Sequence, residues 1–329
     1  MAEEVYPNIH KLTIPLPKNP LKALNAYLIK GNKRHLLIDT GFNRPECLAA
    51  MEKELAELGI EKDSFDLFIT HLHGDHSGLA GSLVFENTKV LTGQYCADSL
   101  TKKSTGAKNR FYDFVIQSGL ADMGLTPEDS SIHPGVRYAA QKIEQAQVIK
   151  DGDPIKVGDF ELLCVETIGH TPGHMCLYEP HHQLLFSGDH ILGKITPNIA
   201  IWGNPWTIDQ DYLGEYLKSL DKVGRLKVKL VLPGHRHLVR DLHQRISELK
   251  AHHHFRLEDM LEKLKDEKLT GAQVASRMKW DLSYSSWDKF PPAQKFFATG
   301  EALSHLTHLV FSGLLKKELD QEVVYYARR

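Results

Sequence analysis

The 329-residue chain lacks several features that would point away from a soluble enzyme. No apolar run approaches the roughly 18 residues that a membrane span needs. The four cysteines form no C-x-x-C pair, and so few cysteines are typical of a reducing compartment. The formal net charge of −2 argues against a strongly basic nucleic-acid binder. The first residues, MAEEV, have neither the basic nor the apolar stretch of a signal peptide. We therefore expect no membrane attachment and a cytoplasmic location.

The composition fits a folded enzyme of two domains. Hydrophobic residues make up 42% of the chain and charged residues 25%, so a chain of this length can bury a substantial core. Cys164 and Cys176 alternate within apolar segments, which predicts small core residues rather than reactive thiols.

The most informative stretch runs from Thr70 to Gly78 and reads THLHGDHSG. It follows Phe65–Ile69, an apolar run short enough for a buried strand. Imidazoles suit zinc and iron, and one carboxylate adds charge without the all-oxygen shell that magnesium or calcium prefers. Four such groups exceed what one catalytic metal with an open position needs, so the cluster predicts two metals. These candidate ligands are His71, His73, Asp75 and His76.

Three later motifs offer the remaining ligands, because a sheet brings distant strand ends together. GHTPGH begins at Gly169, SGDH begins at Ser187 and PGH begins at Pro233, and each follows an apolar run. Glycines in these motifs permit tight turns and close backbone approach. The ligands that the motifs add are His170, Asp189 and His235.

Five histidines and two aspartates in this arrangement fit two metals about 3.5 Å apart. We expect Asp189 to bridge them. We expect zinc, with iron or manganese as alternatives, because His/Asp sites accept several metals. The first metal is assigned to His71, His73 and His170, and the second to Asp75, His76 and His235.

With these motifs the chain resembles the metallo-β-lactamase superfamily, over residues 5 to 240. The H-x-H-x-D-H run and the later His170, Asp189 and His235 match the metal motifs of that family in identity and order. Asp39-Thr40-Gly41, after the apolar Leu36-Leu37-Ile38, matches its early D-T-G element, in which the aspartate lies near the metals without binding them. The resemblance implies an αβ/βα sandwich of two mixed sheets, with helices outside and the metals at one edge.

The predicted catalytic domain, residues 1–239, contains an insertion. Between His76 and His170 lie 93 residues, more than a strand, a helix and a hairpin require. We interpret the surplus, about 99–147, as a helical cap with a helical segment at 137–146. It contains a run of lysines and arginines that could hold a substrate phosphate or carboxylate, or could be a solvated face.

The stretch after Asp189 is apolar and carries two tryptophans, Trp202 and Trp206. It precedes a predicted helix near 209–223, with Thr207 or Asp209 as its N-cap. A loop in this position is expected to form a pocket wall for an apolar part of the substrate, together with His174. Packing of both indoles against the cap is the alternative.

Residues 240–329 are predicted to form a second, mainly helical domain. Helices are expected at 241–265, from 270 and at 294–311, followed by two short strands. Helices that precede a terminal hairpin resemble a winged helix, and one branch of the superfamily, which includes a mitochondrial endoribonuclease, has this order. Charge is nearly balanced here, so a packing or homodimer module is favoured over a nucleic-acid platform.

The chemistry expected of two close cations is hydrolysis by a bridging hydroxide, whose pKa they lower toward neutrality. Asp75 is the first catalytic candidate, since it can bind metal and accept a hydrogen bond from the nucleophile. Asp39, a second catalytic candidate, could fix the tautomer of a ligand, as could His174 and His190. Oxygen-reducing di-iron relatives carry glutamate where this chain has His73, which favours hydrolysis over redox chemistry.

The substrate class follows only from resemblance. The GHTPGH motif at 169–174 is similar to that of hydroxyacylglutathione hydrolases, which cleave thioesters. Their glutathione-binding segment has no match here, so we expect a small-molecule acyl thioester or related ester. The alternative is a phosphodiesterase or endoribonuclease that acts on single-stranded RNA. A metal-stabilised binding protein is a third class.

Overall fold

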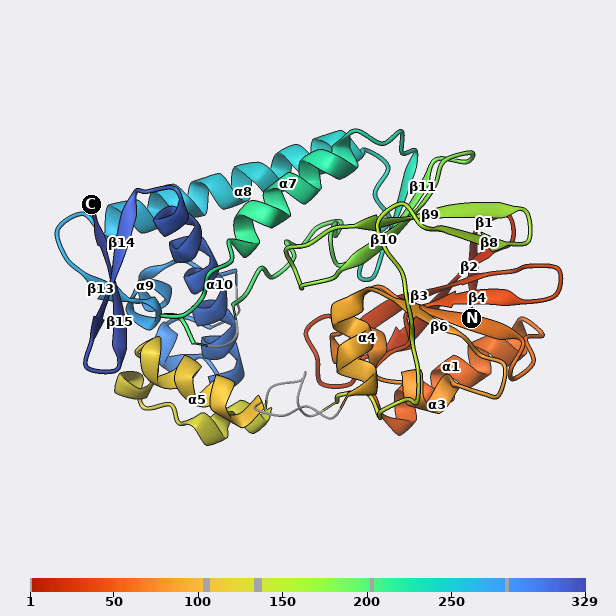
Figure 1. The fold of residues 1–329 in the computed structure, drawn as a ribbon, viewed down its shortest axis with the longest axis horizontal. Helices are drawn as coiled ribbons and strands as arrows, with labels where there is room; N and C mark the ends of the chain where they lie inside the picture. The colour runs from red at the N-terminus through yellow and green to blue at the C-terminus, as the bar shows by residue number, and fades with distance from the viewer. Residues whose placement is uncertain (1, 103–106, 133–137, 202–203, 282–283) are drawn as a thin grey trace. The chain divides into compact units, whose positions relative to one another are not determined.

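The computed structural model describes residues 2–102, 107–132, 138–201, 204–281 and 284–329 (Figure 1). None of the helices within these ranges is long and apolar enough to cross a membrane. The chain separates into two compact units: the first consists of Met1–Lys103, Pro134–Pro197 and Ser219–Ile246, and the second of Ser104–His133, Asn198–Lys218 and Ser247–Arg329. The predicted domain boundary after residue 239 stays a prediction.

The first unit contains a seven-stranded sheet in the order β1-β2-β3-β4-β5-β6-β7. Strands β1 to β4 are antiparallel neighbours, and β4 to β7 run parallel. Parallel neighbours end at the same edge, so the loops after β4 and β5 lie side by side. The strands are Glu3–Tyr6, Ile9–Pro15, Ala23–Ile29, His35–Ile38, Phe65–Ile69, Val90–Thr92 and Gln147–Val148.

The same unit contains a five-stranded sheet in the order β12-β11-β10-β9-β8. Only β11 and β12 are parallel, so their following loops also share one edge. The other pairs are antiparallel. In chain order from β8 to β12, the strands are Pro154–Val157, Phe160–Glu166, Met175–Glu179, Leu184–Gly188 and Leu230–Pro233.

The two sheets pack face to face, with helices outside. One core lies between them, where Phe68 and Ile38 of the first sheet meet Phe186 and Leu177 of the second. A second core lies between the first sheet and its helices (Figure 1). These are α1 (Pro45–Glu57), α3 (Ala80–Leu83) and α4 (Gln94–Thr101). The arrangement confirms the predicted sandwich.

Helix α7 (Tyr212–Gly224) ends beside the second sheet. Ser219 Oγ donates to the Ile168 carbonyl at 2.9 Å, next to the end of β9. The sequence placed the N-cap of this helix wrongly at Thr207 or Asp209. Asp211 takes that position, because its carboxylate accepts the Gly214 N–H at 2.8 Å.

The helix predicted at 137–146 is a second error. Residues 138–146 contain no helix, while residue 137 lies outside the described ranges. The segment instead runs along neighbouring elements, where the Ile143 N–H donates to the Leu100 carbonyl at 3.1 Å. A Cβ at Gly74 would lie 2.8 Å from the Tyr138 carbonyl oxygen. These tertiary contacts outweigh the local helical preference of the sequence.

The second unit combines the insertion with the C-terminal segment. Phe114 and Leu120 from the insertion share one core with Met260 and Leu303. A three-stranded antiparallel sheet, in the order β13-β15-β14, completes the unit. The elements are α5 (Ala107–Gln117), η1 (Ala121–Met123), η2 (Pro127–Ile132), α8 (Leu242–Lys263), β13 (Leu269–Thr270), α9 (Gly271–Arg277), η3 (Trp287–Lys289), α10 (Pro292–Phe311), β14 (Leu315–Asp320) and β15 (Val323–Arg328).

Helices α9 and α10 begin at residues that favour helix N-termini. Thr270 caps α9 by accepting the Gln273 N–H at 3.2 Å, and the Gln273 side chain accepts the Thr270 N–H at 2.9 Å. This capping box satisfies two backbone donors. Pro292 stands in the first turn of α10, where a missing N–H costs nothing.

Two buried histidines join α8 to α10. The His305 Nδ1 donates to the Glu301 carbonyl at 2.8 Å, so its Nε2 accepts from the His253 Nδ1 at 3.0 Å. Burial lowers the pKa of His305 to about 3, and the nearby Arg256 charge adds to that effect. Burial also holds the pKa of His253 well below its usual value. Both imidazoles are therefore neutral in the folded protein at neutral pH.

This pair predicts acid sensitivity. An unfolded histidine has a pKa near 6.5, so below that pH the unfolded chain binds a proton that folded His305 refuses. The free energy of unfolding should not depend on His305 above pH 6.5. It should then fall by about 1.4 kcal/mol per pH unit toward pH 3, or roughly 2 kcal/mol at pH 5. Urea unfolding of wild type and His305→Gln at pH 7 and pH 5 measures this, with the exposed His254→Gln as control. An equal pH dependence in wild type and both variants would contradict it.

Candidate metal centre

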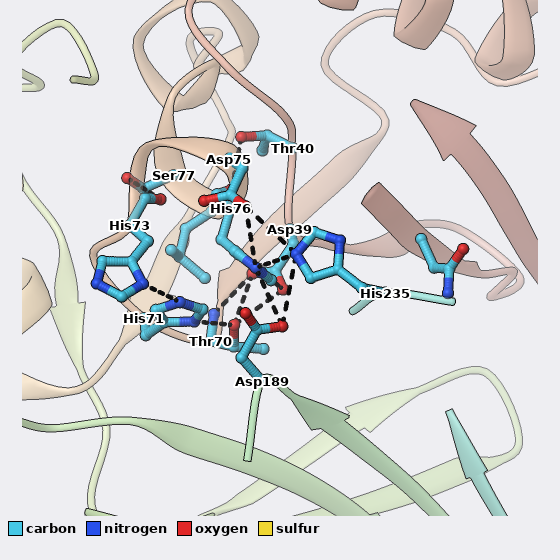
Figure 2. Close-up of polar contacts among 12 residues, drawn as sticks. Asp39, Thr40, Thr70, His71, His73, Asp75, His76, Ser77, Asp189 and His235 are labelled. Carbon is cyan, nitrogen blue, oxygen red and sulfur yellow. Dashed lines mark hydrogen bonds and ion pairs between the residues drawn. The ribbon is translucent and has the colours of Figure 1, made fainter. Parts of the chain in front are cut away.

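Seven predicted ligand residues meet at one edge of the sandwich, all within the first compact unit. Figure 2 labels all of them except His170. His71 and His73 follow β5, and Asp75 and His76 lie on the one-turn helix α2 (Gly74–Ser77). The others lie in the loops that leave the second sheet: His170 follows β9, Asp189 follows β11 and His235 follows β12. The described residues contain three groups of His and Asp whose ligand atoms lie within 4.8 Å of one another, and all three groups are here.

The first group consists of three histidines. The His71 Nε2 lies 3.1 Å from the His73 Nδ1, which lies 2.9 Å from the His170 Nε2. Nitrogens bound at 2.0–2.1 Å around a tetrahedral zinc are about 3.3 Å apart, so this spacing suits three ligands of one ion.

The second group faces the first. The His76 Nε2 lies 3.3 Å from the His235 Nε2, and the Asp75 Oδ2 lies 3.2 Å from the same His235 nitrogen. Two imidazole nitrogens and one carboxylate oxygen are again an open three-ligand set.

Asp189 lies between the two groups. Its Oδ2 is 3.6 Å from the His170 Nε2, whereas its Oδ1 is 3.4 Å from the His76 Nε2 and 3.6 Å from the His235 Nε2. The Oδ1 is buried and has no hydrogen-bond donor among the described residues. A buried carboxylate oxygen without a donor needs a positive partner, and each oxygen of Asp189 faces one ligand group.

Hydrogen bonds aim the ligand nitrogens. The Asp39 carboxylate accepts from the His76 Nδ1 at 2.7 Å, which leaves the His76 Nε2 as the nitrogen that faces the other ligand groups. Thr70 donates its hydroxyl to Asp39 at 2.8 Å and therefore accepts from the His71 Nδ1 at 3.0 Å. The His235 Nδ1 donates to the Ala23 carbonyl at 2.8 Å. In all three imidazoles the Nε2 therefore faces the cluster, which is the orientation that metal binding requires.

Two glycines allow the loops to approach this closely. Gly188 has a φ of +47°, and a Cβ there would lie 2.8 Å from the His174 Nε2. A Cβ at Gly234 would lie 2.7 Å from the His76 Cε1 and 2.9 Å from the Asp189 Oδ1. A larger residue at Gly188 would therefore displace His174, and a larger residue at Gly234 would displace the proposed ligands His76 and Asp189.

The electrostatics of the cluster call for added positive charge. Burial lowers the pKa of His73 to about 3, so this imidazole is uncharged at neutral pH and can act as a metal ligand. Burial also acts to lower the pKa of His76, but Asp189 and Asp39 outweigh it and hold that pKa well above its usual value. Burial acts to raise the pKa of Asp75, yet the charge on His76 holds it at about 2. The histidines nearby also hold the pKa of Asp189 well below its usual value, so two ionised carboxylates lie in one buried volume, and divalent cations would balance them. The residues therefore fit a pair of divalent metals.

The other predicted site residues have different surroundings. Asp39 is buried and acts on the cluster through His76. His174 is fully buried, with its Nδ1 against the Thr167 hydroxyl at 2.8 Å and its Nε2 accepting the Asp189 N–H at 3.2 Å. These contacts do not support a place in the substrate pocket for His174, and they favour its other predicted role of orienting a ligand.

Of the two tryptophans predicted to line a pocket, the structure describes only Trp206. Trp202 lies outside the described residues. Trp206 belongs to the second unit and is 38% exposed. Its backbone N–H donates to the Gln117 side chain of α5 at 3.1 Å. The pocket role of Trp206 stays a prediction.

Sequence reasoning did not assign a role to Thr70, the residue that links Asp39 to His71. Its N–H and hydroxyl both donate to the Asp39 carboxylate. The sequence shows that Thr70 directly precedes His71, but a sequence motif does not indicate which side chain a threonine contacts. Thr40 was missed in the same way, and its hydroxyl donates to the His76 carbonyl at 2.7 Å.

Comparison with known proteins defines the class. Residues 21–235 match the sequence model of the metallo-beta-lactamase superfamily, and residues 288–329 match that of the metallo-beta-lactamase-like C-terminal domain. The chain belongs to the metallo-beta-lactamase superfamily and is a hydrolase of that superfamily.

Particular relatives extend this result. The acyl-coenzyme A thioesterase MBLAC2 of Homo sapiens is 27% identical over 218 residues, which cover 64% of this chain and 72% of the human protein. A metallo-beta-lactamase family protein from Thermus thermophilus has a similar structure, with a TM-score of 0.77, 27% identity and 99% and 100% of the two chains covered. A beta-lactamase domain protein from Burkholderia ambifaria, at 24% identity and a TM-score of 0.78, shares the fold over 100% of this chain and 95% of its own.

Proposed function

We propose that this protein is a binuclear metal-dependent hydrolase of acyl thioesters or related acyl esters. The binuclear site is supported mainly by the position of Asp189, because its two carboxylate oxygens face different ligand groups. Thioesters are favoured because the human relative is named an acyl-coenzyme A thioesterase. The resemblance of the GHTPGH motif to thioester-cleaving enzymes agrees with this choice.

Seven residues would hold the metals in the proposed site. His71, His73 and His170 would bind one ion, Asp75, His76 and His235 would bind the other, and Asp189 would bridge them. When bound, two divalent cations would polarise the substrate carbonyl and make a water molecule more acidic. We expect zinc, with iron or manganese as alternatives, because nitrogen-rich sites accept several metals.

The chain itself would orient the ligands and the attacking water. Asp75 is 13% exposed, so its carboxylate could accept a hydrogen bond from the attacking water as well as bind a metal. Asp39 and Thr70 would keep His76 and His71 in the tautomers that direct their Nε2 atoms inward. His174 would position Asp189 through its backbone N–H.

Two further roles belong to the proposal. Trp206 would contact an apolar part of the substrate, and the C-terminal elements would form a winged-helix-like packing module. A cytoplasmic location is also retained from the sequence.

The decisive experiment is hydrolysis of an acyl-thioester panel by protein of measured metal content. Coenzyme A thioesters with acyl chains of increasing length, and a glutathione thioester, would be assayed by release of the free thiol. We expect turnover that prefers coenzyme A derivatives and requires bound metal. Inactivity toward the whole panel, with two metals bound per chain, would refute the thioester proposal. Cleavage of single-stranded RNA by the same sample would then favour the phosphodiesterase alternative.

A further inference from the structure

The loop that carries His235 receives several hydrogen bonds from the opposite sheet. His235 follows β12 of the five-stranded sheet, and Figure 2 shows it on the side of the cluster away from His73. The hydrogen-bond donors come from β3, a strand of the seven-stranded sheet. A candidate ligand that one sheet supplies is thus held in place by the other sheet.

Asn25 of β3 binds three carbonyl groups of this loop. Its backbone N–H donates to the Gly234 carbonyl at 2.7 Å. Its side-chain Nδ2 donates to the Pro233 carbonyl at 3.0 Å and to the Arg236 carbonyl at 3.0 Å. Both side-chain partners can only accept, so the amide nitrogen rather than the amide oxygen must face them. Asn25 therefore binds the backbone on both sides of His235.

The conformation and burial of the loop make these donors important. Arg236 has a φ of +65°, in the left-handed region that residues with a side chain rarely adopt. Pro233 is buried, and a buried carbonyl that loses its donor destabilises the conformation that contains it. Asn25 is only 6% exposed, so a side chain of similar size without a donor would leave little room for water to replace the amide.

Two other residues of β3 contact the same loop. Ala23, Asn25 and Tyr27 are two positions apart along the strand, so their side chains share one face of the sheet. The Tyr27 hydroxyl donates to the Pro233 carbonyl at 2.8 Å, and the Ala23 carbonyl accepts from the His235 Nδ1 at 2.8 Å. Strand β3 therefore fixes both the backbone around His235 and the orientation of its ring.

We propose that Asn25 is a positioning residue for the metal that the group of Asp75, His76 and His235 would hold. It acts through His235, because its side chain binds the backbone carbonyls that flank this histidine. The histidines of the first ligand group come from other loops, so Asn25 should have little effect on the first metal. The inference rests on the binuclear site of the proposed function and not on its substrate.

Zinc binding by the full-length protein, measured without substrate, tests the proposal. Asn25→Leu keeps a similar side-chain size and removes both side-chain donors. Competition with a chromophoric chelator would give the affinity of each bound zinc ion. We expect the zinc of the second group to bind about 10–100-fold more weakly, as when other outer partners of a ligand are lost, and the zinc of the first group to bind as in wild type.

Asn32→Leu is the matched control. Asn32 is exposed in the turn that follows β3, so the same change there should leave the affinity for both zinc ions as in wild type. Unchanged affinity for both ions in Asn25→Leu would overturn the proposal. Equal weakening of both ions would also overturn it, because that result indicates a general loosening of the fold.

A second variant identifies which metal is affected. His235→Ala should retain only the zinc of the first group. Adding Asn25→Leu to His235→Ala should change the affinity for this zinc no further, because Asn25 acts only through His235. A further loss of affinity in the double variant would overturn the proposal.

Tyr27→Phe tests the same loop with a smaller change. It removes the hydroxyl that donates to Pro233 and keeps the ring, which packs against Phe186 at 5.4 Å between centroids. It should weaken the same zinc by a smaller factor, because Asn25 still binds that carbonyl. If Asn25→Leu does not fold, unchanged zinc affinity in Tyr27→Phe overturns the proposal.

The wild-type result separates this inference from the proposed function. Fewer than two zinc ions bound per wild-type chain would refute the binuclear site and this inference together. Two zinc ions in wild type, with equal affinities in Asn25→Leu, would refute only the role of Asn25.

Discussion

Replacing Asp189 by alanine is expected to remove bound metal and hydrolase activity together. The carboxylate is 8% exposed and faces both histidine groups, at 3.6 Å from the His170 Nε2 and 3.4 Å from the His76 Nε2. Loss of an outer partner of a metal ligand costs about 10–100-fold in affinity or activity, and loss of a bridging ligand should cost more. Metal content by mass spectrometry and turnover of an acyl thioester would be measured on the same sample.

The matched control for this experiment is Asp159→Ala. Asp159 is an exposed aspartate in the turn between β8 and β9, at the opposite end of β9 from His170. We expect it to keep wild-type metal content and rate. A fully metallated and fully active Asp189→Ala variant would refute the assignment of Asp189. Retained metal with lost activity would instead limit the role of Asp189 to the chemistry.

Replacing Arg256 by methionine is expected to destabilise the protein by about 3–5 kcal/mol. The Arg256 Nε lies 3.1 Å from a Glu301 carboxylate oxygen, and the two side chains are 8% and 14% exposed. The guanidinium also stacks over the Trp280 ring at 4.1 Å. Removing the cation leaves a nearly buried carboxylate without its counter-charge, which is the costly way to break such a pair. The free energy of unfolding in urea would report the loss.

Arg277→Met provides the control for Arg256→Met. Arg277 pairs with Glu267 at 2.5 Å, but these side chains are 43% and 52% exposed, so that change should cost at most about 1 kcal/mol. The double variant Arg256→Met/Glu301→Leu should recover much of the stability, because an apolar pair fills the same volume without a buried charge. Equal losses in Arg256→Met and Arg277→Met would contradict the importance of burial.

Much of the candidate site was predictable because its residues follow strands. The run from His71 to His76 is adjacent in sequence, and short apolar runs before His170, Asp189 and His235 indicated strand ends. Strand ends at a shared sheet edge are close in space, so residue type and position were sufficient to group them. All seven predicted ligands do lie together in the structure.

The supporting contacts were less predictable, because they depend on which atoms face each other. Asp39 was expected near the metals only from family resemblance, while its bonds to Thr70 and His76 come from the parallel pairing of β4 with β5. His174, which belongs to the GHTPGH motif, was expected in the substrate pocket, but its Nε2 accepts the Asp189 N–H. A position within a motif does not indicate whether a side chain faces the substrate pocket or forms a hydrogen bond with a neighbouring residue.

The failed helix prediction at 137–146 has a similar cause. Local propensity favoured a helix, but Tyr138 and Gln141 lie against the backbones of Gly74 and Gly81, and Ile143 bonds to Leu100. Contacts with residues roughly 40 to 70 positions away decided the conformation of this segment. Sequence periodicity reflects only neighbours along the chain, so it gave no indication of these tertiary contacts.

The sequence by itself determined the candidate ligand set and the strands that carry it, because metal chemistry restricts residue types and strand periodicity is local. Only the tertiary structure decided that Asp189 has one oxygen toward each ligand group. It also decided that the insertion shares a core with the C-terminal helices. Each of these depends on distances between segments far apart in the chain, and such distances are set by packing rather than by local sequence.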